Sequence, residues 1–133
     1  MTFVDTSALL AFVDGDDEWH ESAVAAMEDL LAGGGATTHS YVVVETEALV
    51  HRRLGSAVAR KLLEDVIPAL SLVWVDEDLH GRAVATHLRG LRRGSSLVDH
   101  VSFELMRRRS IRSAFAFDRD FGREGFTLVP AQT

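Results

Sequence analysis

Short apolar segments alternate with longer helix-like stretches along this chain, and this alternation restricts the fold more than any other feature. Strands that are separated by helices pair in parallel, because each return to the same edge of a sheet needs a crossover connection. Residue pairs typical of hairpin turns are scarce between neighbouring strand-like segments. The sequence therefore predicts an α/β fold with a mostly parallel sheet.

The apolar runs and the helical periodicity give approximate boundaries for the elements. Gly33–Gly35 and Pro68 are expected to end helices, Ser40 to cap the helix that follows it, and Thr6 or Ser7 to cap the first helix. The predicted strands cover residues 1–4, 36–38, 71–75, 113–117 and 125–129. The predicted helices cover residues 7–13, 18–32, 41–53, 56–66 and 77–91, and a last one opens at 95–99 and runs to about 109.

A length of 133 residues fits one domain, here residues 1–133, and a hydrophobic content of 47% is sufficient for a core. Cysteine is absent, which excludes disulfides and Cys-ligated zinc. The N-terminus has no basic region or apolar signal core, and no apolar run is long enough to cross a membrane. These features predict a soluble protein of the cytoplasm that does not bind a membrane.

The charges are distributed unevenly along the chain. Residues 1–78 have a net charge of −11 and residues 79–133 a net charge of +5, and every base in the second segment is Arg. Arg binds phosphate in a bidentate way, so an Arg-rich half is a modest indication of a polyanionic partner. Arg92 and Arg93 are candidates for contacts with an RNA backbone or with an acidic tail of a protein partner; the alternative is that they are solvated or paired with the acidic half.

Four acids stand out because their neighbours are apolar: Asp5, Glu45, Asp99 and Asp118. Asp5 and Asp118 each follow a predicted strand, and parallel strands release such residues at the same edge of the sheet. Asp99 lies in the first turn of a helix, where an acid is also explained by the helix dipole alone. We expect these acids to meet in one pocket. Asp120 is a second candidate for the role of Asp118, which is preferred because it directly ends the strand.

Carboxylates held together repel one another and lose solvation, and a hard divalent cation offsets both effects. Mg²⁺ or Mn²⁺ is therefore the expected cofactor, with Asp5, Asp99 and Asp118 as metal ligands. Such a site suits phosphodiester hydrolysis. Glu45 would orient water or complete the ligand shell, and Thr6 or Ser7 would support a carboxylate or a water.

Four segments resemble the four acidic motifs of PIN-domain nucleases, and the match is nearest to the VapC-type toxins of bacterial toxin–antitoxin pairs. In this sequence they read Val-Asp-Thr-Ser-Ala-Leu at 4–9, Tyr-Val-Val-Val-Glu-Thr at 41–46, Leu-Val-Asp-His-Val-Ser-Phe at 97–103 and Phe-Asp-Arg-Asp-Phe at 117–121. One departure is Ala116, because many members have Thr or Ser two residues before the fourth acid.

The resemblance implies a three-layer α/β/α fold with a central, mostly parallel sheet of four or five strands, and Mg²⁺-dependent endoribonuclease activity. It implies that Asp5 and Asp99 bind metal most directly and that Glu45 and Asp118 complete the acidic pocket. It also implies a cognate antitoxin of the VapB type and a homodimer.

Two other functions fit parts of the pattern. A phospho-accepting receiver domain is also α/β with acids at strand ends, but it needs paired acids after the first strand and a Lys after its last main strand. Here hydroxyl residues follow Asp5, and the only lysine, Lys61, lies in a predicted helix. A catalytically inactive PIN-like binding module is the second alternative, against which the four intact acids argue.

Overall fold

A computed structural model describes residues 1–132 of the chain. Within this range one sheet has the strand order β3-β2-β1-β4-β5, and every neighbouring pair is parallel. The strands are β1 (Thr2–Val4), β2 (Ala36–His39), β3 (Ser71–Val73), β4 (Ser113–Phe115) and β5 (Thr127–Val129). The predicted parallel α/β fold is therefore confirmed.

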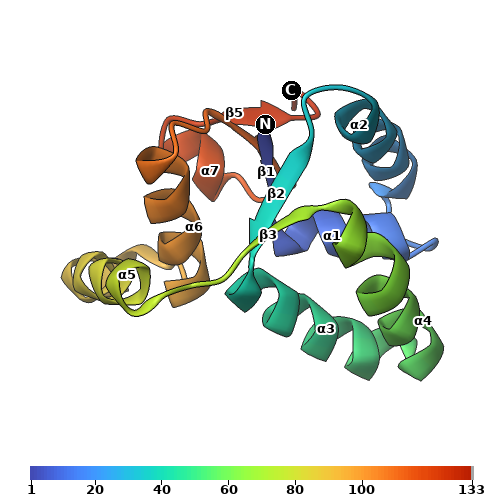
Figure 1. Ribbon diagram of the computed structural model, residues 1–133, viewed down its shortest axis with the longest axis horizontal. Helices are drawn as coiled ribbons and strands as arrows, with labels where there is room; N and C mark the ends of the chain where they lie inside the picture. Colours follow the sequence, from blue (N-terminus) through green and yellow to red (C-terminus); the bar gives the residue numbers. More distant parts are fainter. Residues whose placement is uncertain (133) are drawn as a thin grey trace.

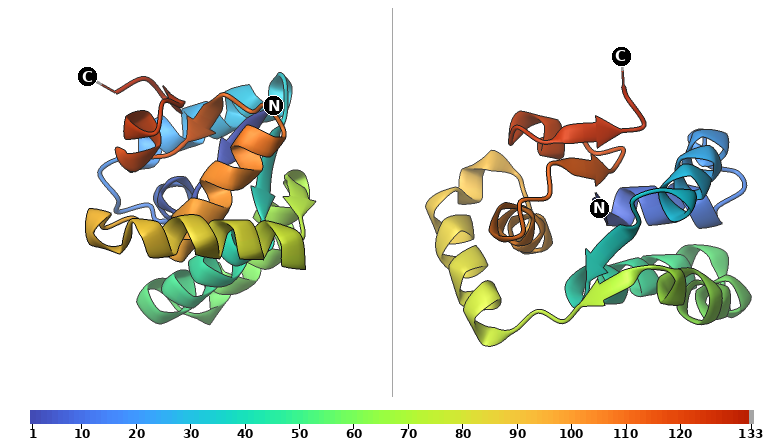
Figure 2. Two further views of the ribbon diagram at one scale, coloured as in Figure 1. Left: turned by 90° about the vertical axis from the view of Figure 1, so that its left-hand side faces the viewer. Right: turned by 45° about the horizontal axis from the view of Figure 1, so that its top comes forward.

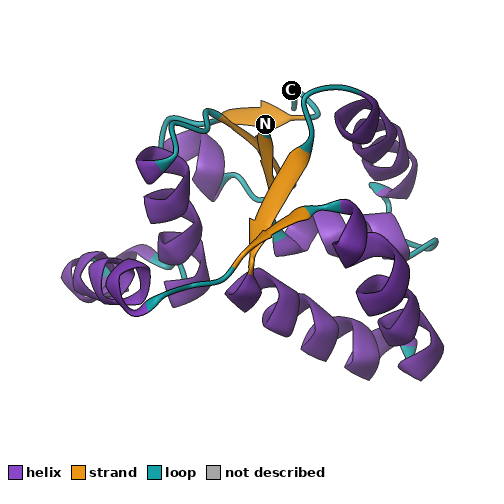
Figure 3. Ribbon diagram, in the orientation of Figure 1, coloured by secondary structure: helices purple, strands orange, loops and turns teal. Residues whose placement is uncertain are grey.

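Helices cover both faces of the sheet, which gives three layers (Figures 1, 2 and 3). Helices α1 to α4 lie on one side, and α5 to α7 lie on the other. Their bounds are α1 Thr6–Val13, α2 His20–Ala32, α3 Ser40–Leu54, α4 Ser56–Lys61, α5 Glu77–Arg89, α6 Leu97–Arg108 and α7 Asp120–Arg123. A π-helical turn at Leu62–Val66 and a 3-10 turn at Ile67–Ala69 extend α4, and a 3-10 turn at Leu91–Arg93 joins α5 to α6.

Aromatic rings fix α6 and α7 against the centre of the sheet. Phe3 of β1 stacks on Phe121 of α7 at 6.0 Å between centroids, and Phe121 meets Phe103 of α6 edge-on at 5.0 Å. All three side chains are buried, and each such burial stabilises the fold by about 1.5–3 kcal/mol. The start of α6 and the loop before α7 are thereby held beside the end of β1.

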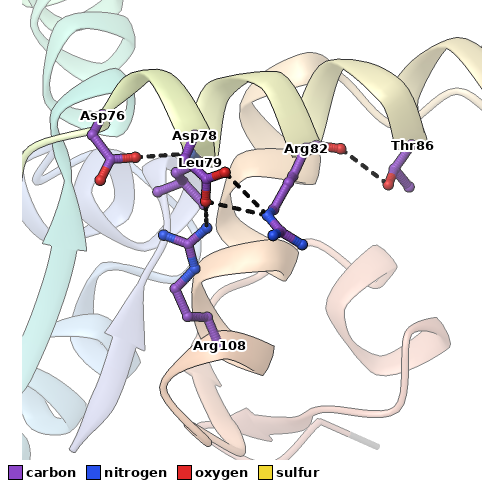
Figure 4. A network of polar contacts seen from close by, with 6 residues as sticks. All are labelled: Asp76, Asp78, Leu79, Arg82, Thr86 and Arg108. Carbon is purple, nitrogen blue, oxygen red and sulfur yellow. Dashed lines mark hydrogen bonds and ion pairs between the residues drawn. The ribbon is translucent and has the colours of Figure 1, made fainter.

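Helix α5 packs on α6 through a polar network at its N-terminus (Figure 4). Asp76 caps α5 by accepting from the backbone N–H of Leu79 at 2.8 Å. Asp78 accepts from Arg82 at 3.2 Å and from Arg108 of α6 at 2.6 Å, and Arg82 is the main reason that the pKa of Asp78 is lowered. The network contributes little stability because its groups are solvated, but it occupies Arg108.

Three local predictions were wrong. The strand predicted at 113–117 ends at Phe115, so Asp118 does not directly follow it. His39, and not Ser40, caps α3; the Ser40 hydroxyl instead accepts from the backbone N–H of Val75 at 3.0 Å. Asp5 itself caps α1 in place of Thr6 or Ser7. Within residues 1–132, no helix has both the length and the apolar character needed to cross a membrane.

Candidate functional site

The candidate site lies where the order of the strands changes direction. From β1 the chain adds β2 and then β3 on one side, whereas β4 and β5 lie on the other. Open α/β sheets bind ligands at the carboxyl ends of their strands at such a point. Asp5 directly follows β1, and Asp118 lies three residues beyond the end of the neighbouring strand β4. The topology therefore brings these two acids to one edge of the sheet.

Asp5 is a buried carboxylate with 4% of its surface exposed. Its Oδ2 accepts from both the hydroxyl and the backbone N–H of Ser7, at 2.7 and 3.1 Å. Burial raises the pKa of Asp5 from 3.8 to about 7; the Ser7 hydrogen bonds oppose the rise, and the negative charges of Asp99 and Asp118 add to it. Within residues 1–132 both hydrogen bonds fall on Oδ2, which leaves Oδ1 for an external ligand.

Ser7 links Asp5 to the segment that carries the fourth acid. While its hydroxyl donates to Asp5, the same oxygen accepts from the backbone N–H of Phe117 at 3.0 Å. The predicted supporting role of Ser7 therefore has a structural basis, since one hydroxyl orients the first carboxylate and positions the residue before Asp118.

Asp99, Asp118 and Asp120 form the tightest acidic group, with one carboxylate oxygen from each lying within 4.8 Å of the others. Asp99 belongs to a capping box at the start of α6, where it accepts from the N–H of Ser96 at 2.9 Å while the Ser96 hydroxyl accepts from the N–H of Asp99. Partial burial raises the pKa of Asp99, and the charges of Asp118 and Asp120 raise it further. The electrostatic cost of this group favours a bound cation.

Asp118 and Asp120 differ in how many of their oxygens are already engaged. Asp120 bonds Arg123 through Oδ1 at 3.0 Å and Ser95 through Oδ2 at 3.3 Å. Asp118 accepts only one hydrogen bond within residues 1–132, from the N–H of Asp120 to Oδ1 at 2.9 Å. The structure therefore leaves Asp118 freer to bind a cation, although the original reason for preferring it was wrong.

Glu45 and Thr6 lie near this edge but outside the three-acid group. The hydroxyl of Thr46 donates to that of Thr6 at 3.1 Å in a buried contact between α3 and α1. Thr6 thus joins two helices, and its hydroxyl contacts no carboxylate of residues 1–132. Glu45 directly precedes Thr46 and is half-buried, and no hydrogen bond or ion pair engages its carboxylate within residues 1–132.

Arg92 and Arg93 are exposed in the turn between α5 and α6. No acid of residues 1–132 forms an ion pair with either, whereas Arg107 and Arg108 pair with Glu124 and Asp78. The turn leads directly to Ser95, which contacts the acidic group through Asp120. These two cations are therefore not engaged by an acid of the described residues.

His39 is completely buried, which the local sequence pattern around it does not predict. Its Nδ1 accepts from the N–H of Val42 at 3.2 Å, and its Nε2 donates to Ser102 of α6 at 2.8 Å. Burial lowers its pKa to about 3, so the ring is neutral. The only indication in the sequence is that this histidine lies between a predicted strand and a predicted helix. In the structure His39 holds α6 against the end of β2 through Ser102, one helical turn after Asp99.

The donor set suits a hard divalent cation. It consists of carboxylate oxygens, the ligands that Mg²⁺ and Mn²⁺ prefer, and burial and mutual repulsion raise the pKa values of Asp5 and Asp99. A cation placed among these groups would offset both unfavourable effects. The acids therefore fit a divalent metal centre.

Comparison with known proteins identifies the family of this chain. The model of the PIN domain matches residues 2–126. The 23S rRNA-specific endonuclease VapC20 of Mycobacterium tuberculosis is 35% identical over 133 residues, covering 97% of this chain and 98% of that protein. The crystal structure of VapC20, a sarcin-ricin loop cleaving toxin, superposes with a TM-score of 0.84 at 30% identity, covering 95% of this chain and 96% of that one.

More distant solved structures share the fold alone. FitAcB from Neisseria gonorrhoeae has a TM-score of 0.72 at 15% identity, covering 96% of each chain. A toxin–antitoxin complex from Klebsiella pneumoniae has a TM-score of 0.65 at 14% identity, covering 100% of this chain and 97% of the matched chain. The family model and the full-length similarity to VapC20 together decide the assignment. The chain therefore belongs to the PIN-domain family, among its VapC-type toxin nucleases.

Proposed function

We propose that this protein is a Mg²⁺- or Mn²⁺-dependent endoribonuclease that cleaves ribosomal RNA, with Asp5, Asp99 and Asp118 as metal ligands. The observation that carries the proposal is the meeting of acids distant in sequence where the strand order changes direction. Asp120 holds the loop of Asp118, and Ser7 orients Asp5. Glu45, with its free carboxylate, orients water.

A bound divalent ion would polarise the phosphodiester, neutralise part of its charge and favour deprotonation of the attacking water. The residues of the chain supply the environment for this chemistry. Burial shields the carboxylate of Asp5 from solvent, and the capping box fixes the carboxylate of Asp99 relative to the backbone. Arg92 and Arg93 would hold phosphates of the same RNA nearby.

The direct test is cleavage of 23S rRNA by the purified protein. We expect cleavage with Mg²⁺, none with EDTA, and recovery when Mg²⁺ is restored. Mapping the new RNA ends would identify the site. The choice of ribosomal RNA rests on the full-length similarity to VapC20. A protein that binds RNA without cutting it under any of these conditions would be the inactive module instead.

The partner that we propose is a cognate VapB-type antitoxin that covers the site. The fold is shared with chains solved as a toxin–antitoxin complex, which supports such a partner. We also propose that the toxin acts in the cytoplasm and forms a homodimer, and the mass of the purified protein in solution would test the dimer.

Charge reversal at Arg92 and Arg93 together, by Arg92→Glu and Arg93→Glu, should weaken RNA binding. If both contact phosphates, the slope of log affinity against log salt should become shallower by about 1 to 2. Fluorescence anisotropy of an RNA hairpin over a salt series measures both quantities. The matched control is reversal of Arg52 and Arg53, another exposed neighbouring pair, at the end of α3. Equal effects of the two double variants would remove the Arg92–Arg93 turn from the RNA contact.

Ser7→Ala should raise the Mg²⁺ concentration needed for half-maximal cleavage by about 10- to 100-fold, the usual effect of losing a group that orients a metal ligand. The substitution removes a hydrogen bond to Asp5 and leaves the N–H of Phe117 without its acceptor. A Mg²⁺ titration of the cleavage rate is the measurement, and Ser71→Ala, at an exposed serine of β3, is the control. An unchanged titration would show that Ser7 serves only the fold.

A further inference from the structure

We propose that Trp19, with the pocket beside it, is a subsite where an unpaired nucleobase of the RNA stacks next to the cleaved phosphodiester. The inference rests on the proposed function, because it assigns a contact to the substrate of that reaction. Its physical basis is an aromatic column that runs from the core to the surface beside the acids.

The column consists of three rings. Phe115 of β4 is buried completely and meets Phe117 edge-on at 6.1 Å between centroids. Phe117 in turn stacks on Trp19, with 5.4 Å between centroids and 14° between the ring planes. Trp19 retains 46% of its surface exposed. Core packing therefore supports an indole ring that remains open to solvent.

The backbone of Trp19 is also fixed. Its N–H donates to the side chain of Asp17 at 2.7 Å, and its carbonyl accepts from the N–H of Ala23 at 2.8 Å at the start of α2. A stacking surface that is fixed before the ligand arrives loses little conformational entropy on binding. This is the arrangement that favours recognition of a flat ring.

The column lies beside the proposed metal ligands. Phe117 directly precedes Asp118, and its N–H donates to the Ser7 hydroxyl that holds Asp5. Trp19 therefore stacks on the residue that connects Ser7 to Asp118, and a nucleotide whose phosphate reaches these carboxylates would bring a neighbouring base toward Trp19. Stacking there would fix the position of the RNA relative to the acids.

The pocket beside the column has the chemistry that a nucleotide needs. Its volume is about 530 Å³, and its lining includes Trp19, Phe117, Leu128, Pro130, Arg119 and Gln132. Arg119 is exposed and has no ion pair within residues 1–132, so its guanidinium can meet a phosphate. The amide nitrogen of Gln132 donates to the carbonyl of Ala116 at 2.7 Å, which leaves the amide oxygen as an acceptor for a base edge.

The chain offers a matched control in its second tryptophan. Trp74 is 75% exposed just beyond β3, and no ring of residues 1–132 stacks on it. Stacking of a base on an aromatic side chain does not depend on which base it is, because every base has a flat ring face. We expect such stacking at an indole ring that is held in place and is linked to the acids. Of the two exposed indoles, only Trp19 meets that description.

The test compares Trp19→Ala, Trp19→Leu, Trp19→Phe and Trp74→Ala in binding and in cleavage of an RNA hairpin taken from 23S rRNA, the proposed substrate. Loss of one stacked base predicts that Trp19→Ala and Trp19→Leu raise the Kd and KM by about 5- to 150-fold. Trp19→Leu keeps an apolar cover over Phe117, so it separates lost stacking from lost folding. Trp19→Phe should retain most of the affinity, and Trp74→Ala all of it.

An abasic scan of the hairpin identifies the base itself. We expect one position near the cut where removal of the base weakens binding to the wild-type protein but not to Trp19→Ala. Unchanged Kd and KM in Trp19→Leu, with active wild-type protein, would overturn the subsite and leave the nuclease intact. Wild-type protein that binds the hairpin through Trp19 without cutting it would support the subsite and remove the proposed activity. Loss of affinity for the antitoxin alone would make Trp19 a protein contact and overturn the inference.

Discussion

Asp5→Asn and Asp99→Asn are each expected to lower the rate of RNA cleavage at saturating Mg²⁺ by at least about 10²- to 10³-fold, the cost of removing one group that stabilises charge in a transition state. An amide retains the shape of the carboxylate and can still accept from Ser7 or Ser96. It does not retain the negative charge that attracts a cation. Single-turnover cleavage of the RNA, with circular dichroism of each variant, measures the loss and checks the fold.

Two controls separate charge from structure. Asp29→Asn removes a carboxylate from the exposed face of α2 and should leave cleavage unchanged. Ser96→Ala breaks the other half of the capping box, with a cost in stability of about 1 kcal/mol, but keeps every acid. Loss of activity in Ser96→Ala equal to that in Asp99→Asn would mean that Asp99 acts through the helix start. Full activity in both Asp→Asn variants would refute the metal site.

The position of Asp5 was predictable because the residues next to it in the sequence are enough to define the end of a strand. A short apolar run and a helix immediately after it define a strand end, and parallel pairing then fixes the edge to which the strand end belongs. The same reasoning placed Asp99 in a first helical turn. Local pattern thus identified the elements and the edge of the sheet.

The length of a strand was less predictable, because it depends on how far the neighbouring strands extend, and the sequence of one segment does not show which residues pair with it. The segment 113–117 alternates Ala and Phe in a β-like way, yet β5 offers partners only from Thr127 to Val129. Beyond Phe115 the chain turns away, and Asp120 then joins Asp99 and Asp118. The inclusion of Asp120 in the acidic group could not be derived from the strand pattern.

Contacts between distant residues were the least accessible to sequence reasoning. The hydrogen bond from the N–H of Phe117 to Ser7 joins residues 110 positions apart, and the stack of Trp19 on Phe117 joins two loops. Burial of His39 depends on Ser102 of α6 being opposite it. Such pairs follow from tertiary packing, which no local periodicity contains.

In the absence of metal, the Asp5 carboxyl should destabilise the fold as the pH rises. Its pKa is about 7 in the native protein and 3.8 as the reference value, so between these values the native state keeps a proton that the unfolded state has released. Stability therefore falls across this range, by about 4 kcal/mol in total. Below the lower value both states are protonated, and this loss is absent.

His39 opposes Asp5 over most of the same range. Its pKa is lowered from 6.5 to about 3, so its contribution to stability is complete above pH 6.5 and is lost as the pH falls. Between about pH 4 and 6.5, Asp5 and His39 change the free energy of unfolding with pH in opposite directions and by similar amounts per pH unit. The stability of the wild-type protein alone would conceal both effects, whereas comparison with Asp5→Asn cancels the His39 contribution that the two proteins share.

We therefore expect the free energy of unfolding of Asp5→Asn, minus that of the wild-type protein, to increase by about 4 kcal/mol between pH 4 and pH 8 in EDTA. Urea denaturation at a series of pH values measures this difference, with Asp29→Asn as the control. A difference that does not change with pH would mean that Asp5 ionises in the fold as easily as in the unfolded chain.

The same comparison with Mg²⁺ at pH 8 links stability to the site. A cation that binds the ionised native carboxylates stabilises the wild-type protein in proportion to the logarithm of the cation concentration above Kd. Mg²⁺ should therefore reduce the difference in the free energy of unfolding between Asp5→Asn and the wild-type protein. The variant lacks one ligand and should gain much less. A buried acid that served only to cap α1 would not make the stability of the protein depend on Mg²⁺. If Mg²⁺ leaves the difference in the free energy of unfolding unchanged, Asp5 does not bind the cation and serves the fold alone.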